Sequence, residues 1–151
     1  AERILSFVRF LVRLNEHAEK KTLSVAKLIQ PQGGSKHARI AEVVDYIVKE
    51  FSEALSVSEA AKMARMTEIT FSRNFQTVTG HSFVAFLTMI RIGEACGILY
   101  ASDDQIIMIS QAAGFKNLAN FNRRFLKVKG MTPSEYRETA RKDLAPQLEN
   151  S

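Results

Sequence analysis

An internal repeat constrains the fold of this chain more than any other feature of its sequence. When the sequence is shifted by 50 residues, residues 71–75 (FSRNF) align with residues 121–125 (FNRRF). Further upstream the shift becomes 49, and residues 63–66 (MARM) align with residues 112–115 (AAGF). Self-similarity of this kind indicates one supersecondary unit that is built twice.

Each copy of the repeat has the pattern of a helix, a tight turn and a second helix. Small residues such as Ala64 and Ala113 allow the first helix to approach the second closely. The second helix has phenylalanine at i and i+4, which predicts anchoring in a core, and arginine at i+2 on a different side. This pattern is typical of a helix-turn-helix unit.

Helix start signals support the same reading. Thr67 and Asn117 stand at equivalent positions and predict N-caps of the second helices. Residues 56–59 (SVSE) and 132–135 (TPSE) read as capping boxes, the latter with proline at the first helical position. Because no stretch alternates convincingly between apolar and polar residues, we expect an all-α fold.

The repeat suggests four parts of the chain. Residues 1–28 are expected to form a separate apolar helical segment, which serves dimerisation or is the remnant of a missing N-terminal domain. Residues 29–37 contain proline and glycines and predict a flexible linker. Residues 38–142 hold the two helix-turn-helix units, and residues 143–151 form a tail.

Charge is distributed unevenly along the sequence. The 151 residues carry a net charge of +5, yet residues 116–142 alone carry eight Lys or Arg and two acidic residues. Residues 38–115 carry six Lys or Arg and nine acidic residues. The second copy of the repeat is therefore the stronger candidate for a polyanion-binding surface.

Several other classes of protein are poorly supported by the sequence. With one cysteine, Cys96, and three histidines without ligand spacing, we expect neither a disulfide nor a metal or other cofactor. We find no carboxylate pair, phosphate-binding glycine loop or nucleophile-base set, so we expect no enzyme. No apolar run predicts a membrane span or a signal peptide, and the single thiol suits a reducing cytoplasm.

The second copy and its surroundings resemble the AraC/XylS family of transcriptional regulators. The resemblance rests on residues 112–115 (AAGF), Phe121, Arg123, Phe125, Gly130, residues 132–134 (TPS), Tyr136 and Arg137, and extends over about residues 40–140. It implies two tandem helix-turn-helix units, each with a recognition helix for the DNA major groove. It also implies that residues 82 to about 100 form a long helix connecting the units.

Three residues depart from the family pattern. Arg65 stands where the turn glycine is usual, so the turn either avoids the left-handed conformation or accepts strain. Phe83 replaces a common proline, and Ile69 replaces a residue that is often polar or aromatic. The resemblance therefore implies no particular base preference for the first unit.

The position of each residue in the repeat predicts its contact with DNA. Base contacts are expected from Glu68, Ile69, Ser72, Arg73, Leu118, Ala119, Asn120, Asn122 and Arg123. Phosphate contacts are expected from Thr67, Lys116, Asn117, Arg124, Lys127, Lys129, Thr132 and Arg137. The alternatives are a surface ion pair or phosphate contact for the two arginines, backbone contact for the asparagines, and core packing for Leu118 and Ala119. Arg91 is expected to orient the two units through an internal carboxylate.

The leading prediction is a sequence-specific DNA-binding regulator of transcription, with double-stranded operator DNA as its partner. RNA polymerase and a second copy of the chain, bound through residues 1–28, are further expected partners. Activation and repression both remain open, with activation as the working expectation. The alternative is a helical protein-interaction module without DNA specificity of its own.

Overall fold

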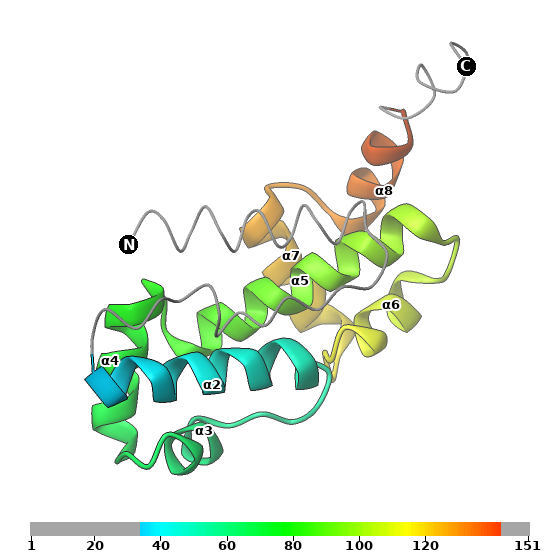
Figure 1. The fold of residues 1–151 in the computed structure, drawn as a ribbon. Helices are drawn as coiled ribbons and strands as arrows, with labels where there is room; N and C mark the ends of the chain where they lie inside the picture. The colour runs from blue at the N-terminus through cyan, green and yellow to red at the C-terminus, as the bar shows by residue number, and fades with distance from the viewer. Residues whose placement is uncertain (1–33, 143–151) are drawn as a thin grey trace. The chain divides into compact units, whose positions relative to one another are not determined.

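The computed structural model describes residues 34–142, and these residues form helices connected by short turns (Figure 1). No strand occurs among them, which confirms the all-α prediction. The helices are α2 (Gly34–Glu50), α3 (Val57–Met63), α4 (Glu68–Thr79), α5 (Phe83–Ala101), α6 (Ile106–Ala112), α7 (Leu118–Lys129) and α8 (Pro133–Lys142). The expected N-terminal helical segment, most of the linker and the tail lie outside the described residues.

The helix bounds follow the sequence repeat. The second helices of the two copies, α4 and α7, begin and end 50 residues apart, whereas α3 and α6 are 49 residues apart. Thr67 and Asn117 cap α4 and α7, because each side chain accepts a hydrogen bond from the backbone N–H three residues later. The predicted helix-turn-helix units are therefore present in both copies.

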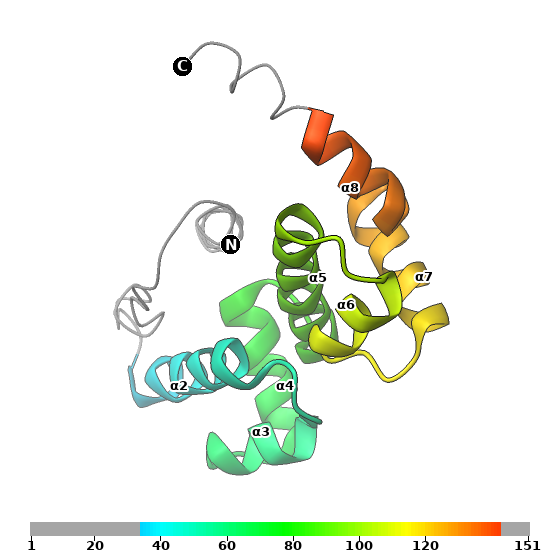
Figure 2. The same ribbon diagram turned by 90° about the vertical axis from the view of Figure 1, so that its right-hand side faces the viewer.

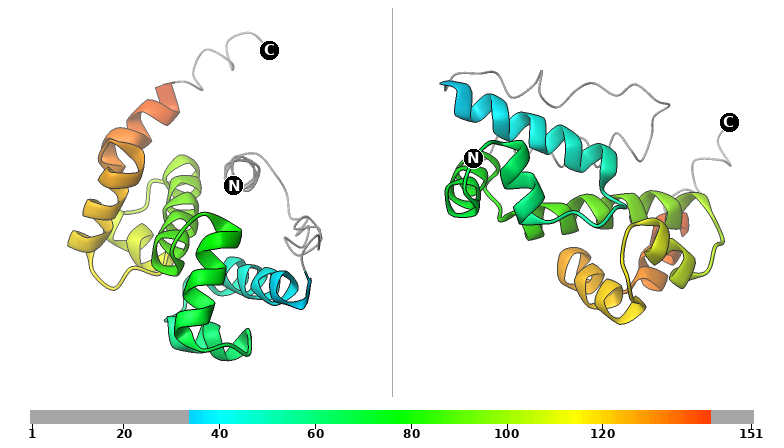
Figure 3. Two further views of the ribbon diagram at one scale, coloured as in Figure 1. Left: turned by 90° about the vertical axis from the view of Figure 1, so that its left-hand side faces the viewer. Right: turned by 90° about the horizontal axis from the view of Figure 1, so that it is seen from below.

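The first compact unit has its core between α2, α3, α4 and the beginning of α5. Both α2 and α3 pack against α4, as the view from below shows (Figure 3). Apolar side chains of all four helices meet in this core, including Ile47, Ala61, Phe71, Phe75 and Phe86. Ala64, also in this core, is fully buried, which agrees with its expected role in close helix packing.

The second compact unit repeats this arrangement with the end of α5, α6, α7 and α8. Helix α6 contacts α7, and α7 contacts α8, the neighbouring helices drawn in yellow to red (Figure 2). The core contains Ile92, Leu99, Ile109, Phe121 and Phe125, all essentially inaccessible to solvent. Each unit thus has a hydrophobic core of its own.

Helix α5 contributes to both cores. The division between the two units falls between Ile90 and Arg91, within this helix, so the region that we expected to form one double domain contains two compact units.

Among the described residues, α5 is also the one helix whose length and composition would allow it to cross a membrane. Its apolar residues include Phe86 and Leu99, which are buried in the first and second core respectively. Core packing is therefore sufficient reason for its composition.

The start of α2 differs from the expectation. Residues 34–37, which the sequence assigns to the linker, already lie in the helix, which begins at Gly34. No proline follows Pro31 before the end of α2, and Lys36 to Arg39 are compatible with helix. The helix therefore extends further toward the N-terminus than its apolar pattern, which starts at Ile40, indicates.

Candidate nucleic-acid interface

Helix α4 is anchored in the first unit by two phenylalanines. The rings of Phe71 and Phe75 are fully buried, with their centroids 5.3 Å apart. Both also contact Phe83 at the start of α5, at centroid distances of 6.1 and 5.9 Å. Phe83, which replaces a common proline, thereby supplies aromatic packing that holds α4 in place.

The residues expected to read bases from α4 are all exposed. Glu68, Ile69, Ser72 and Arg73 lie outside the core. Ile69 has 77% of its surface accessible, the largest fraction among the exposed large apolar residues of the described chain. Ile69 thus lies outside the first core and exposes its apolar surface to solvent.

Helix α7 is anchored in the second unit in the same way. Phe121 and Phe125 are fully buried, and their ring centroids are 5.5 Å apart. Phe121 contacts Phe115 at 5.1 Å, and Phe125 contacts Tyr136 of α8 at 5.7 Å. The recognition helix is therefore fixed from both neighbouring segments, the turn before it and the helix after it.

The residues expected to read bases from α7 are placed less uniformly. Ala119, Asn122 and Arg123 are exposed, whereas Leu118 is partly buried and packs against the second core. This placement agrees with the alternative that Leu118 packs against the core rather than reading a base. Asn120 is partly buried, and its side-chain oxygen accepts a hydrogen bond from Nη2 of Arg123 at 3.0 Å.

The turns that precede the two recognition helices each contain a left-handed residue at the equivalent position. Gly114 has φ of 88°, and Arg65, which takes its place in the first copy, has φ of 55°. Of the two alternatives for Arg65, the structure therefore shows the left-handed one. The conformation costs an L-residue about 1–2 kcal/mol relative to the right-handed region, so this turn is strained.

Three of the expected phosphate ligands serve as helix caps. Thr67 Oγ1 and Asn117 Oδ1 accept the backbone N–H groups of Thr70 and Asn120, at 3.3 and 2.7 Å. Thr132 and Glu135 form a reciprocal capping box, in which the Thr132 N–H donates to Glu135 Oε2 at 2.7 Å. This bond holds the pKa of Glu135 below its ordinary value.

The four remaining positive charges of the second recognition helix and its turn differ in environment. Lys116 and Lys127 are exposed, whereas Arg124 and Lys129 are partly buried. The Lys129 ammonium lies 5.4 Å from the ring centroid of Tyr136, in a cation–π arrangement. All four lie in the basic region that charge counting indicated.

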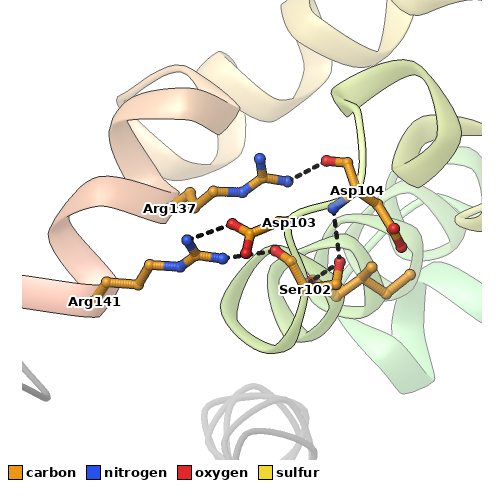
Figure 4. A network of polar contacts seen from close by, with 6 residues as sticks. Ser102, Asp103, Asp104, Arg137 and Arg141 are labelled. Carbon is orange, nitrogen blue, oxygen red and sulfur yellow. Dashed lines mark hydrogen bonds and ion pairs between the residues drawn. The ribbon is translucent and has the colours of Figure 1, made fainter.

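Arg137 has a contact that the sequence did not reveal. Its Nη2 donates a hydrogen bond of 2.6 Å to the backbone carbonyl of Asp104, in the segment that follows α5 (Figure 4). One turn further along α8, Arg141 donates from Nη1 to Asp103 Oδ1 at 2.6 Å and from Nη2 to the Ser102 carbonyl at 2.7 Å. The two arginines thus hold α8 to the end of α5.

This arginine contact also affects the acidic partner. The hydrogen bond and the charge of Arg141 lower the pKa of Asp103. The available signal in the sequence was the spacing of four between Arg137 and Arg141, together with the consecutive residues Asp103 and Asp104. Because the partners are 33 to 39 residues apart, the pattern alone could not show that they meet.

Arg91 also has a role within the second unit. Its guanidinium carbon lies 5.9 Å from the centroid of the Phe115 ring, and burial lowers the pKa of Arg91. Phe115 in turn contacts Phe121 of α7. This aromatic contact links Arg91 to the recognition helix through one ring, and the expected carboxylate partner of Arg91 stays a prediction.

Comparison with known families decides the classification. A family model described as a helix-turn-helix domain matches residues 60–139, which is more than half of the chain. This range begins in α3 and ends in α8, and therefore includes both recognition helices and the signature at residues 112–115. The chain belongs to the AraC/XylS family.

Individual relatives agree with this classification. The RCS-specific HTH-type transcriptional activator RclR of Escherichia coli K12 is 29% identical over 110 residues, which cover 73% of this chain and 38% of that protein. The chain thus spans well under half the length of this curated relative. A helix-turn-helix regulator of Bacillus subtilis, YobQ, is 30% identical over 139 residues, 91% of this chain and 57% of that protein.

A solved structure shows the same fold. The DNA-binding domain of the global transcriptional factor AdpA, crystallised with a target DNA, has a TM-score of 0.67 and 28% identity. The match covers 70% of this chain and 95% of that domain. The described residues of this chain therefore have the tandem helix-turn-helix architecture of the AraC/XylS family.

Proposed function

We propose that this AraC/XylS chain recognises a specific operator in double-stranded DNA by inserting α4 and α7 into the major groove. The observation that carries the proposal is the shared construction of the two helices. In each, a pair of buried phenylalanines fixes one side, and an exposed arginine, Arg73 or Arg123, projects from another. An α-helix fits the major groove, where an arginine binds guanine through two hydrogen bonds.

The surrounding charges support the same proposal. Lys116, just before α7, and Lys127, one turn after Arg123, are exposed, and Arg124 and Lys129 keep part of their surface accessible. Neutralisation of phosphates by such residues releases counterions and makes affinity depend steeply on salt. Thr67, Asn117 and Thr132 cap helix N-termini, which attract phosphates, and we propose that they contact the DNA backbone while remaining caps.

The related AdpA domain provides further support. Its structure contains a target DNA, and its fold is similar to that of this chain at 28% identity. We therefore assign the readout to the exposed residues at the equivalent helices here. The proposed base-reading set comprises the α4 residues Glu68, Ile69, Ser72 and Arg73 and the α7 residues Ala119, Asn122 and Arg123. The partly buried Asn120 and Leu118 lie next to these residues on α7.

Selection of bound duplexes from a random pool tests this proposal. We expect one enriched motif, bound at least about 1,000-fold more tightly than an unrelated duplex at the same salt concentration. Enrichment of no motif, or equal affinity for all duplexes, would contradict sequence-specific recognition. The alternative function, a protein-interaction module, predicts that the chain captures a protein partner and shows no DNA affinity.

We propose that the protein activates transcription and contacts RNA polymerase. Support comes from RclR, which is named a transcriptional activator. Two large apolar side chains of α6, Ile107 and Met108, are 43% and 57% exposed and offer a surface for a protein. In vitro transcription from a template that carries the selected motif distinguishes activation, with more transcript, from repression, with less.

We also propose that the protein acts in the cytoplasm and that residues 1–28 mediate a homodimer. Access to operator DNA supports the first point, and cell fractionation tests it. The apolar pattern of residues 1–28 supports the second point. Sedimentation of the full chain and of a chain without these residues should show self-association only in the former, while both bind DNA.

A further inference from the structure

Arg123 is held by a neighbour on its own helix. Its Nη2 donates a 3.0 Å hydrogen bond to Oδ1 of Asn120, one turn earlier in α7. Residues three positions apart on a helix are neighbours on its surface, so the bond needs no change in backbone. Arg123 is exposed and Asn120 is partly buried, and the pair therefore lies where the recognition helix meets solvent.

Asn120 is itself fixed in place. Its backbone N–H donates to Oδ1 of Asn117, the N-cap of α7, at 2.7 Å. This end of α7 is also held by Phe121, which is fully buried. The side-chain oxygen that bonds to Arg123 thus projects from a restrained part of the helix.

The hydrogen bond to Arg123 affects how Asn120 can contact a base. An asparagine that reads adenine accepts a hydrogen bond from the adenine N6 group and donates one to N7. In this structure the accepting oxygen of Asn120 is engaged with Arg123. The observed geometry therefore favours an action of Asn120 on Arg123 over direct readout of adenine.

We propose that Asn120 is a positioning residue that orients the guanidinium of Arg123 toward guanine in the major groove. The inference rests on the proposed function and deepens it. Recognition of guanine requires two parallel N–H groups of one guanidinium to meet O6 and N7. A side chain that is already restrained loses less conformational entropy when it binds, which improves both affinity and discrimination.

The first copy of the repeat has no such pair. Thr70 takes the place of Asn120, and its Oγ1 accepts a hydrogen bond from the hydroxyl of Thr67 at 2.9 Å. Within residues 34–142, no side chain is hydrogen-bonded or ion-paired to the guanidinium of Arg73. The two arginines at equivalent positions therefore differ in restraint, and Arg123 is expected to discriminate more strongly than Arg73.

The test compares variants of the full chain on the duplex that the wild-type protein selects. For each variant, the ratio of affinities for this duplex and for its derivatives with one changed base pair is measured at fixed salt. Arg123→Ala identifies the guanine that Arg123 reads. We expect Asn120→Ala to reduce the preference for that same guanine about 2- to 10-fold.

Two further variants separate orientation from other effects. Asn120→Asp keeps an acceptor for Arg123, so it should retain the preference for guanine even if its added charge weakens overall affinity. Thr70→Ala, at the matched position of the first copy, should leave the preference at the base pair read by Arg73 unchanged. Thermal melting of every variant shows whether the fold is retained.

Four results would overturn the inference. In the first, Asn120→Ala relaxes a different base pair, which would make Asn120 a base reader. In the second, Asn120→Ala leaves all base preferences unchanged. In the third, the losses from Asn120→Ala and Arg123→Ala add in the double variant, which would show that the two residues act independently. These three results leave the proposed function intact. A wild-type chain that selects no sequence would refute the proposed function as well.

Discussion

Arg65 and Gly114 occupy the same position in the two copies of the repeat, and both have a left-handed backbone, with φ of 55° and 88°. The turn between the helices thus imposes one conformation on two different residues. Glycine adopts it without strain, whereas arginine does not. The neighbouring elements, α3 and α4, must therefore hold Arg65 in place through their packing in the first core.

Replacement of Arg65 by glycine should stabilise the first unit by about 0.5 kcal/mol. The change relieves about 1–2 kcal/mol of backbone strain, and the greater freedom of glycine in the unfolded chain offsets part of this gain. Gly114→Ala is the matched control and should destabilise the second unit by about 1 kcal/mol. Urea unfolding measures both changes, and a loss of stability in Arg65→Gly would show that the turn is not strained.

Acid should weaken the attachment of α8 to the end of α5. Arg141 lowers the pKa of Asp103, so the carboxylate contributes stability that is fully present above the unfolded pKa of about 3.9. This contribution is lost as the pH falls below that value and through the lowered pKa of the folded state. Thermal melting of the wild-type protein and Asp103→Asn between pH 6 and 3 should therefore give melting temperatures whose difference shrinks as the pH falls.

Asp104→Asn is the control for this pH dependence. Arg137 binds the backbone carbonyl of Asp104 rather than its carboxylate, so this contact survives the substitution. The variant should keep the pH dependence that Asp103→Asn reduces. If Asp103→Asn has the same pH profile as the wild-type protein, the ion pair with Arg141 makes no contribution in solution.

Asn117 should have two separable roles. Asn117→Ala removes the N-cap of α7 and should destabilise the second unit by about 1 kcal/mol. Asn117→Asp keeps the cap, so its stability should stay near that of the wild-type protein, whereas its negative charge should weaken DNA binding. Melting and gel-shift titration measure the two effects, and unimpaired binding by Asn117→Asp would exclude a phosphate near this cap.

Lys127 and Arg141 should differ in their effect on the salt dependence of DNA binding. Lys127 is exposed and has no ion pair within residues 34–142, so Lys127→Gln should reduce the slope of log affinity against log salt by about 0.9. Arg141 is paired with Asp103, and Arg141→Gln should leave the slope near its wild-type value. Equal changes in slope would show that Arg141 also contacts phosphate.

Local patterns were sufficient to predict much of the fold. The capping residues Ser56, Thr67 and Asn117 and the spacing of the phenylalanines depend on neighbours within one or two helical turns. The repeat then gave the order of the helices, because each copy carries the same signals. Residues 1–28 and 143–151 lie outside the described residues, and the expectations for them stay predictions.

Contacts between distant residues were not predictable in this way. The sequence predicted a phosphate contact for Arg137 and indicated no partner for Arg141, yet both bind the segment after α5, more than 30 residues away. The conformation of Arg65 depends on whether packing outweighs strain, which no local pattern decides. The bond between Asn120 and Arg123 had a suitable spacing, but several other partners were open to both residues.

Specific DNA recognition by the two recognition helices is tested most directly by one comparison of affinities. The wild-type protein, Arg73→Ala and Arg123→Ala are titrated at fixed salt with the selected duplex and with an unrelated duplex. We expect Arg123→Ala to lose about 5- to 150-fold in affinity for the selected duplex and little for the other, with a smaller loss for Arg73→Ala. Equal losses on both duplexes, or no loss, would contradict base readout by these helices.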